Sequence, residues 1–150
     1  MPACATGTQT ERSTVRSIAR ARSYVARCLA RCGYTIIVPA RPRFEDDAAG
    51  AAEAITRETP GATVIIPDTP LDLTSLASVR AFGAAMRAEY STLEVLCLNA
   101  GRGGAKGDPR DETEGMESIM LTNVYGHFLL AAELMPLLKA AEGGNIIIII

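Results

Sequence analysis

Positions 99–101 hold the residue types of a turn that contacts a ligand through its backbone. Asn99, Ala100 and Gly101 directly follow the apolar run 93–98, which has the length and composition of a buried strand. Asparagine tolerates tight turns, and a small residue beside a glycine lets the backbone approach a planar ring or a sugar. The sequence therefore predicts a ligand contact at the end of this strand.

A second asparagine, Asn123, stands in the middle of the stretch 115–139, whose apolar residues recur at helical spacing. Asparagine is not favoured inside helices, because its amide competes for backbone hydrogen bonds, so we expect tertiary contacts to hold it. We expect this helix to bend or end near Pro136. His127 follows one turn after Asn123, and we interpret it as packing on the helix surface rather than as a catalytic group.

Other candidate residues also come after apolar runs. They are Thr6 and Gly7 after the run 2–5, Arg41 and Arg43 after 34–38, and Asp72 and Leu73 after 62–66. In open parallel sheets the ligand lies beyond the carboxyl ends of the strands, so these residues are expected near it. Two alternatives stay open: the arginines belong to a solvated loop, and Asp72 caps a helix or closes a turn. The glycine-rich segment 101–107 is interpreted as a plain loop or a flexible lid, because it has no Gly-Lys-Ser/Thr.

Apolar runs alternate with helical patterns along the whole chain. The expected strands are 2–5, 34–38, 62–66, 93–98 and 145–150, and the expected helices are 15–32, 48–59, 76–90 and 115–139. Gly33 and Pro60-Gly61 are natural stops for the first two helices, and Thr74 or Ser75 is placed to cap the third. Continuous apolar strands between helices indicate an α/β fold with a doubly wound parallel sheet, in one domain that spans residues 1–150.

Three segments carry a resemblance to a known family. They are LDLTSLASVRAF at 71–82, LEVLCLNAG at 93–101 and NVYGHFLL at 123–130. Together, and in this order, they resemble the short-chain dehydrogenase/reductase family, and their wording looks closest to its retinol-dehydrogenase and protochlorophyllide-reductase branch. The resemblance implies a Rossmann-like domain that binds a nicotinamide dinucleotide, NAD(P), and an oxidoreductase whose substrate is a small-molecule carbonyl, alcohol or alkene.

The resemblance also assigns roles to individual residues. The dinucleotide would be contacted by Thr6, Gly7, Asp72, Leu73, Asn99, Ala100 and Gly101. Asn123 would belong to the catalytic group and help to organise a proton-relay water. A basic residue at Arg41 or Arg43 would pair with the 2′-phosphate of NADP, which makes NADP the expected cofactor and NAD the less favoured one.

The sequence departs from the family's glycine-rich phosphate loop. The family places Thr-Gly-x-x-x-Gly-x-Gly after the first strand, whereas no glycine lies between Gly7 and Gly33 here. Alignment backwards from Gly33 puts Arg20, Ala21 and Arg22 where Gly-x-Gly belongs. Either the arginines supply charge in place of backbone contacts or the loop is damaged. We favour damage, because an arginine side chain occupies the space that the phosphate needs, and we expect weak dinucleotide binding.

The family's catalytic Tyr-x-x-x-Lys has no counterpart in these 150 residues. None of the tyrosines, at 24, 34, 90 and 125, is followed by a lysine four residues later. By resemblance, the family's catalytic serine would follow the strand 145–150, so we expect an amino-terminal half that is truncated after the fifth strand and inactive alone. The alternative is a non-catalytic fragment or interaction module that uses the helix 115–139.

Charge and composition exclude several other classes of protein. Residues 1–43 carry eight arginines against Glu11 alone, a net charge of +7, but no recognition motif or aromatic set accompanies them, so nucleic-acid binding is not expected. One histidine and no Cys-x-x-Cys argue against a zinc site, and we expect no metal. No apolar run is long enough to span a membrane, which favours a soluble, intracellular protein, cytoplasmic by default. The arginine-rich start leaves a plastid or mitochondrial transit peptide as the alternative.

The isoleucine-rich segment 146–150 bears on self-association. In the strand order 3-2-1-4-5-6, a sheet that ends at its fifth strand leaves this strand at the edge. Five β-branched residues without charge or proline are typical of an aggregation-prone strand. We therefore expect a homo-oligomer or an aggregate.

Overall fold

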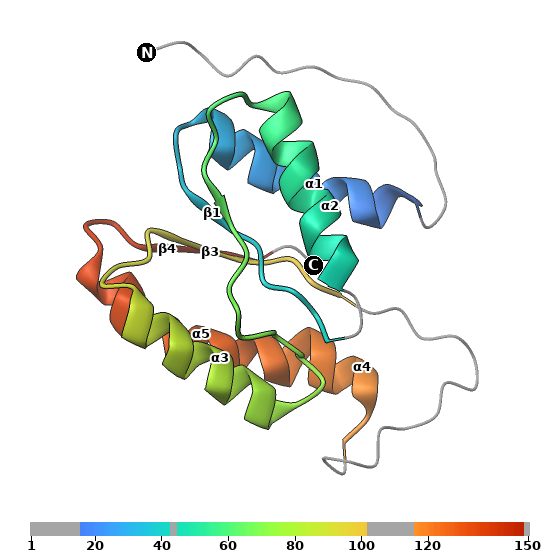
Figure 1. Cartoon of the computed structure of the whole chain (residues 1–150). Coiled ribbons are helices and arrows are strands. Elements are labelled where there is room, and N and C mark those ends of the chain that lie inside the picture. The colour runs from blue at the N-terminus through green and yellow to red at the C-terminus, as the bar shows by residue number, and fades with distance from the viewer. Residues whose placement is uncertain (1–15, 43–44, 102–115, 149–150) are drawn as a thin grey trace.

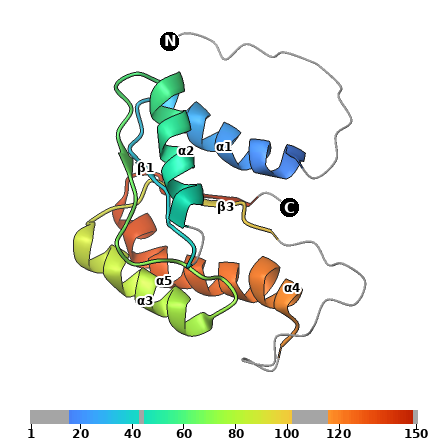
Figure 2. The same cartoon turned by 45° about the vertical axis from the view of Figure 1, so that its right-hand side comes forward.

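Helices cover both faces of the strands in this chain (Figures 1 and 2). The computed structural model describes residues 16–42, 45–101 and 116–148. Helices α1 (Arg16–Arg31) and α2 (Glu45–Glu58) lie on one side of the strands β3 (Val95–Leu98) and β4 (Asn145–Ile148). Helices α3 (Leu76–Glu89) and α5 (Gly126–Ala140) lie on the other side. This arrangement confirms the expected α/β class with helices on both faces of parallel strands.

The first half of the described chain is built around two short strands, β1 (Ile36–Ile37) and β2 (Val64–Ile65), which pair in parallel with Ile36 opposite Val64. Glycine ends the helix before β1, as the sequence predicts: Gly33 has a φ of 89°, in the left-handed region that glycine adopts without strain. The Tyr34 N–H donates to the Leu29 carbonyl over a distance of 3.2 Å, which satisfies one of the last carbonyls of α1. Ile55 of α2 is fully buried against Ile36 and holds the helix to the strand.

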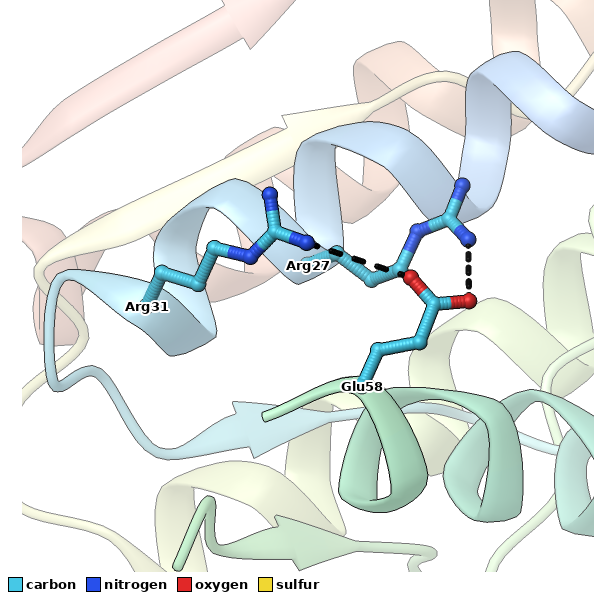
Figure 3. A network of polar contacts seen from close by, with 3 residues as sticks. All are labelled: Arg27, Arg31 and Glu58. Atoms are coloured by element: carbon cyan, nitrogen blue, oxygen red, sulfur yellow. Dashed lines mark hydrogen bonds and ion pairs between the residues drawn. The ribbon is translucent and has the colours of Figure 1, made fainter. Parts of the chain in front are cut away.

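An ion pair joins the two helices of this half (Figure 3). Arg27 Nη1 of α1 lies 2.7 Å from Glu58 Oε1 of α2, and Arg31 Nη2 lies 4.0 Å from Glu58 Oε2. The glutamate is the last residue of its helix, so both arginines reach the same end of α2. These side chains are partly exposed, and such pairs stabilise a fold by about 0–1 kcal/mol, so apolar packing rather than charge holds α1 to α2.

The second half contains the larger core. Strands β3 and β4 pair in parallel from Val95 opposite Asn145 to Leu98 opposite Ile148. The buried side chains of this core come from α3, β3 and α5, together with one residue before α3: Leu73, Val79, Phe82, Met86, Leu96, Leu98, Leu130, Leu134, Leu137 and Leu138. Of the two candidate caps for α3, the structure uses Ser75, whose Oγ accepts a hydrogen bond of 3.3 Å from the Ser78 N–H.

The long helix expected at 115–139 differs from the prediction. It consists of α4 (Ser118–Met120), a π-helical turn η2 (Leu121–Tyr125) and α5, which continues through Pro136 to Ala140. The interruption thus lies at Asn123 and not at the proline. Pro136 is exposed, whereas the leucines on either side of it are buried, so their packing offsets the hydrogen bond that the proline cannot donate.

Several expected features lie outside the described residues. They are the strand 2–5, Thr6, Gly7, Arg43, the loop from 102 and the last two isoleucines. Within the ranges that the structure does describe, no helix is both long enough and apolar enough to cross a bilayer.

Candidate functional site

The strand end and the asparagine of the helix come together, although they are far apart in sequence. Asn99 and Ala100 directly follow β3, and Gly101 comes next, exposed at the surface. A Cβ built on Gly101 would lie 3.9 Å from Asn123 Oδ1, which is ordinary van der Waals contact. The Asn123 side chain therefore faces the backbone at the carboxyl end of β3, where a ligand of a parallel sheet is expected.

A π turn presents Asn123 to this strand end. The Gly126 N–H donates to the Leu121 carbonyl, five residues back, in place of the four residues of an α-helix. Leu121 is fully buried, and Thr122 Oγ1 donates to the Ser118 carbonyl over 2.8 Å. Core packing and this hydrogen bond therefore stabilise the turn. Single π turns inside α-helices occur frequently at functional sites, because they alter which backbone carbonyls and side chains are exposed.

The turn at 71–73 is organised by its own side chain. Asp72 Oδ1 accepts hydrogen bonds from the backbone N–H of Thr74 at 2.9 Å and from its hydroxyl at 2.6 Å. The Asp72 N–H donates to Ser78 Oγ at 3.0 Å. The turn-closing role that the sequence leaves open for Asp72 is thus observed, and a contact to a dinucleotide through this turn stays a prediction.

Leu73 joins this turn to the Asn123 helix. A Cβ built on Gly126 would lie 2.5 Å from the Leu73 carbonyl oxygen and 3.1 Å from Leu73 Cβ, so only glycine fits at this point. Sequence reasoning does not single out Gly126. Its signal is a glycine inside a strongly apolar helical stretch, where glycine costs about 1 kcal/mol relative to alanine and therefore indicates a packing requirement.

The segment that carries Arg41 is tied to the same turn. The Leu71 N–H donates to the Ala40 carbonyl over 2.8 Å, which links the residues after β1 to those before α3. Arg41 itself is exposed. The backbone therefore connects the carboxyl end of β1 to the turn at 71–73 and this turn to Gly126 after the π turn, and the Asn123 side chain faces the end of β3.

His127 and Cys97 are the titratable groups whose pKa is shifted in this region. Burial lowers the pKa of His127, and a hydrogen bond to the Asn123 backbone, which raises it, offsets this only in part. The imidazole is therefore neutral at neutral pH, in keeping with a packing role. Burial raises the pKa of the Cys97 thiol within β3. No group of three potential metal ligands occurs in the described ranges.

The candidate site does not coincide with either of two hollows in the described surface. Two hollows elsewhere on the described surface have volumes of about 240 and 290 Å³. One lies between 65–69 and the end of α3, and the other lies between the turns that follow α1 and α2. Neither is lined by Asn99, Gly101 or Asn123, so we place the candidate site by strand ends and by the close approaches there.

Parallel strands covered by helices on both faces are the architecture of a Rossmann-type domain. A model of the short chain dehydrogenase family matches residues 21–150, and the chain belongs to this family. Thr6 and Gly7 precede the matched range.

Relatives point to the retinol-dehydrogenase-like branch, as expected from the sequence. Dehydrogenase/reductase SDR family member 13 of Homo sapiens is 34% identical over 121 residues, which are 81% of this chain and 30% of that protein. Retinol dehydrogenase 12 of Bos taurus is 32% identical over 123 residues, 81% of this chain and 37% of that protein. Polyprenol dehydrogenase of Mus musculus is 48% identical over 77 residues, 49% of this chain and 22% of that protein. The chain thus spans well under half the length of these relatives.

Solved structures agree on the fold. The Pseudomonas aeruginosa RhlG/NADP active-site complex has a TM-score of 0.63 and 25% identity, and the similarity covers 83% of this chain and 47% of that one. L-Sorbose reductase from Gluconobacter frateurii, complexed with NADPH and L-sorbose, has a TM-score of 0.65 and 25% identity, with 83% of this chain and 45% of that one covered.

Proposed function

We propose that this chain binds NADP(H) at the carboxyl ends of its strands, as the nucleotide-binding part of an oxidoreductase that acts on a small-molecule carbonyl, alcohol or alkene. The observation that carries the proposal is the approach of Asn123 Oδ1 to within 3.9 Å of the position of a Gly101 Cβ, which joins the two strongest sequence candidates. When bound, the dinucleotide supplies or accepts the hydride.

Different residues of the site make different contributions to binding. The backbone at 99–101, exposed at Ala100 and Gly101, accepts a flat ligand surface close to the chain, because Gly101 adds no side chain there. The Asp72 turn holds Leu73 in place. Arg41 supplies the positive charge that favours the 2′-phosphate of NADP over the hydroxyl of NAD. Solved relatives with NADP or NADPH bound support this choice of cofactor.

Asn123 is the residue of the family's catalytic group that this sequence holds. Its place in a π turn beside the strand end suits the organisation of a proton-relay water next to a nicotinamide. The 150 residues contain no Tyr-x-x-x-Lys, so we propose that they do not transfer hydride by themselves.

Isothermal titration calorimetry with NADPH tests the binding proposal. Gly101→Val adds bulk where the ligand would approach, and Gly50→Val in α2 is the matched control, because a Cβ on Gly50 meets nothing within 4 Å. We expect NADPH binding by the wild-type chain and by the control, and affinity at least about tenfold lower, or ~1.4 kcal/mol, for Gly101→Val. Equal affinities for the two variants would contradict the site.

A second candidate function is an interaction module without catalysis. The observation that favours it is a group of exposed apolar side chains on η2 and its neighbours: Met120, Val124, Tyr125 and Phe128, the last 76% exposed. Such a group is typical of a protein contact. Under this alternative the chain gives no heat with NADPH but self-associates, and Phe128→Ser lowers its apparent mass in light scattering.

A further inference from the structure

Gly126, the first residue of α5, makes the closest backbone approach in the site. A Cβ at this position would lie 2.5 Å from the Leu73 carbonyl oxygen, 3.0 Å from the Leu121 carbonyl oxygen and 3.1 Å from Leu73 Cβ. Two of the three obstacles are backbone atoms, which cannot rotate away as the end of a side chain can. Any other residue at 126 must therefore move the helix, the turn or both.

The turn at 71–73 is poorly able to yield. Asp72 receives two hydrogen bonds from Thr74 and donates one to Ser78, and Leu73 is 9% exposed within the larger core. The Leu73 carbonyl is thus restrained by the hydrogen bond of the Thr74 N–H in the same peptide group and by the packing of the Leu73 side chain. A side chain at 126 would shift the helix more readily than it would shift the turn.

Displacement of Gly126 would reach Asn123 directly. The Gly126 N–H closes the π turn onto the Leu121 carbonyl, and Asn123 is the central residue of that turn. A Cβ built on Gly101 would lie 3.9 Å from Asn123 Oδ1, so a rotation of η2 that carries Asn123 with it would change the distance from this side chain to the backbone at 101.

We propose that Gly126 is a positioning residue. Because residue 126 has no side chain, the start of α5 packs directly against the Leu73 carbonyl. This close packing sets the position of Asn123 relative to the backbone at 71–73 and 99–101. The consequence for dinucleotide affinity rests on the proposed function, whereas the consequence for the geometry does not.

Gly83 of α3 provides a matched control. A Cβ on Gly83 would lie 2.6 Å from Glu133 Cβ of α5, so Gly83→Ala also strains the packing of α5. Its neighbours, Glu133 and Arg87, belong to the ion pair between α3 and α5 rather than to the site. Both substitutions are thus expected to lower the stability of the chain, but only Gly126→Ala is expected to move Asn123.

The experiment compares Gly126→Ala with Gly83→Ala in the 150-residue chain by two-dimensional ¹H–¹⁵N NMR. We expect both variants to unfold at lower urea concentration. Gly126→Ala alone should shift the Gly101 amide and the Asn123 side-chain amide, and should weaken NADPH binding by at least about tenfold, or ~1.4 kcal/mol. Unchanged signals from Gly101 and Asn123 in Gly126→Ala, or equal shifts in both variants, would overturn the proposal.

A measurement on the wild-type chain covers the case in which Gly126→Ala does not fold. The α-protons of Gly126 should show nuclear Overhauser contacts to Leu73. Absence of these contacts would show that Gly126 does not pack against Leu73 and would overturn the proposal. If the wild-type chain binds no NADPH, the proposed function fails, while the NMR comparison still decides the role of Gly126.

Discussion

Replacement of Arg41 by alanine should abolish most of the preference for NADP over NAD. The side chain follows β1, and the segment that bears it is tied to the 71–73 turn by the bond of 2.8 Å from the Leu71 N–H to the Ala40 carbonyl. We propose that Arg41 contacts the ribose 2′-phosphate of a dinucleotide that lies across the carboxyl ends of the strands. NAD has no 2′-phosphate, so its affinity should change little.

The size of the effect follows from the exposure of the arginine. Hydrogen bonds to charged groups contribute about 1.5–3 kcal/mol, and solvent lowers this at exposed positions, so we expect ~1.5 kcal/mol. That free energy corresponds to a decrease of about tenfold in the NADP/NAD affinity ratio. Because exposed charges are screened beyond about 10 Å at 0.1 M ionic strength, added salt should reduce the ratio for the wild-type chain and leave Arg41→Ala nearly unchanged.

Calorimetric titration of both nucleotides into both proteins measures the ratio. Arg57→Ala is the matched control, since Arg57 is an exposed arginine in the last turn of α2. It lies on the side of the amino end of β2 and not at the carboxyl ends of the strands. The control should keep the wild-type ratio. If Arg41→Ala keeps it too, Arg41 does not contact the 2′-phosphate and the reasoning that selects NADP is refuted.

Three further predictions concern stability, pH and catalysis. Ile55→Ala should lower the free energy of unfolding in urea by about 2–5 kcal/mol, because Ile55 is fully buried, and a loss as small as that of Ile66→Ala, at a residue 38% exposed, would contradict the packing. Burial holds the pKa of His127 below its ordinary value, so the unfolded chain binds the proton first and stability should fall as the pH decreases below about 6.5. His127→Gln should remove that decrease in stability. An unchanged pH profile in this variant would show that protonation of His127 does not cause the decrease. The wild-type chain should not oxidise NADPH with aldehydes, ketones or quinones above background; turnover that Asn123→Ala abolishes would be the opposite result.

Local sequence signals predict the elements but not the details of the site. Gly33 as a helix stop, Ser75 as one of two possible caps and the strand before Asn99 follow from residue types and periodicity, and the structure agrees. The π turn does not follow from local preferences. It depends on the burial of Leu121 and on the Leu73 carbonyl, which comes from a distant part of the chain.

Tertiary packing also overrules one local expectation. The proline at 136 predicts a bend or an end, yet buried leucines around it keep α5 helical to Ala140. At Asp72 the sequence leaves a turn or a helix cap open beside a ligand contact, and the structure shows the turn, which the N–H and hydroxyl of Thr74 close onto Asp72 Oδ1. The burial of the leucines that keeps α5 helical through Pro136 is visible only after the chain has folded, whereas Thr74 lies two residues from Asp72 in the sequence.

We propose that the carboxyl ends of the strands, together with the π turn, form a nicotinamide dinucleotide site. Titration of the ¹⁵N-labelled chain with NADPH, followed by two-dimensional NMR, tests it most directly. We expect shifts concentrated at 71–73, 99–101 and 121–127, with smaller or weaker changes on titration with NADH. Shifts confined to the hollow formed by 30–35 and 59–63, at the amino ends of β1 and β2, or no shifts at millimolar NADPH, would contradict a dinucleotide site at the carboxyl ends of the strands.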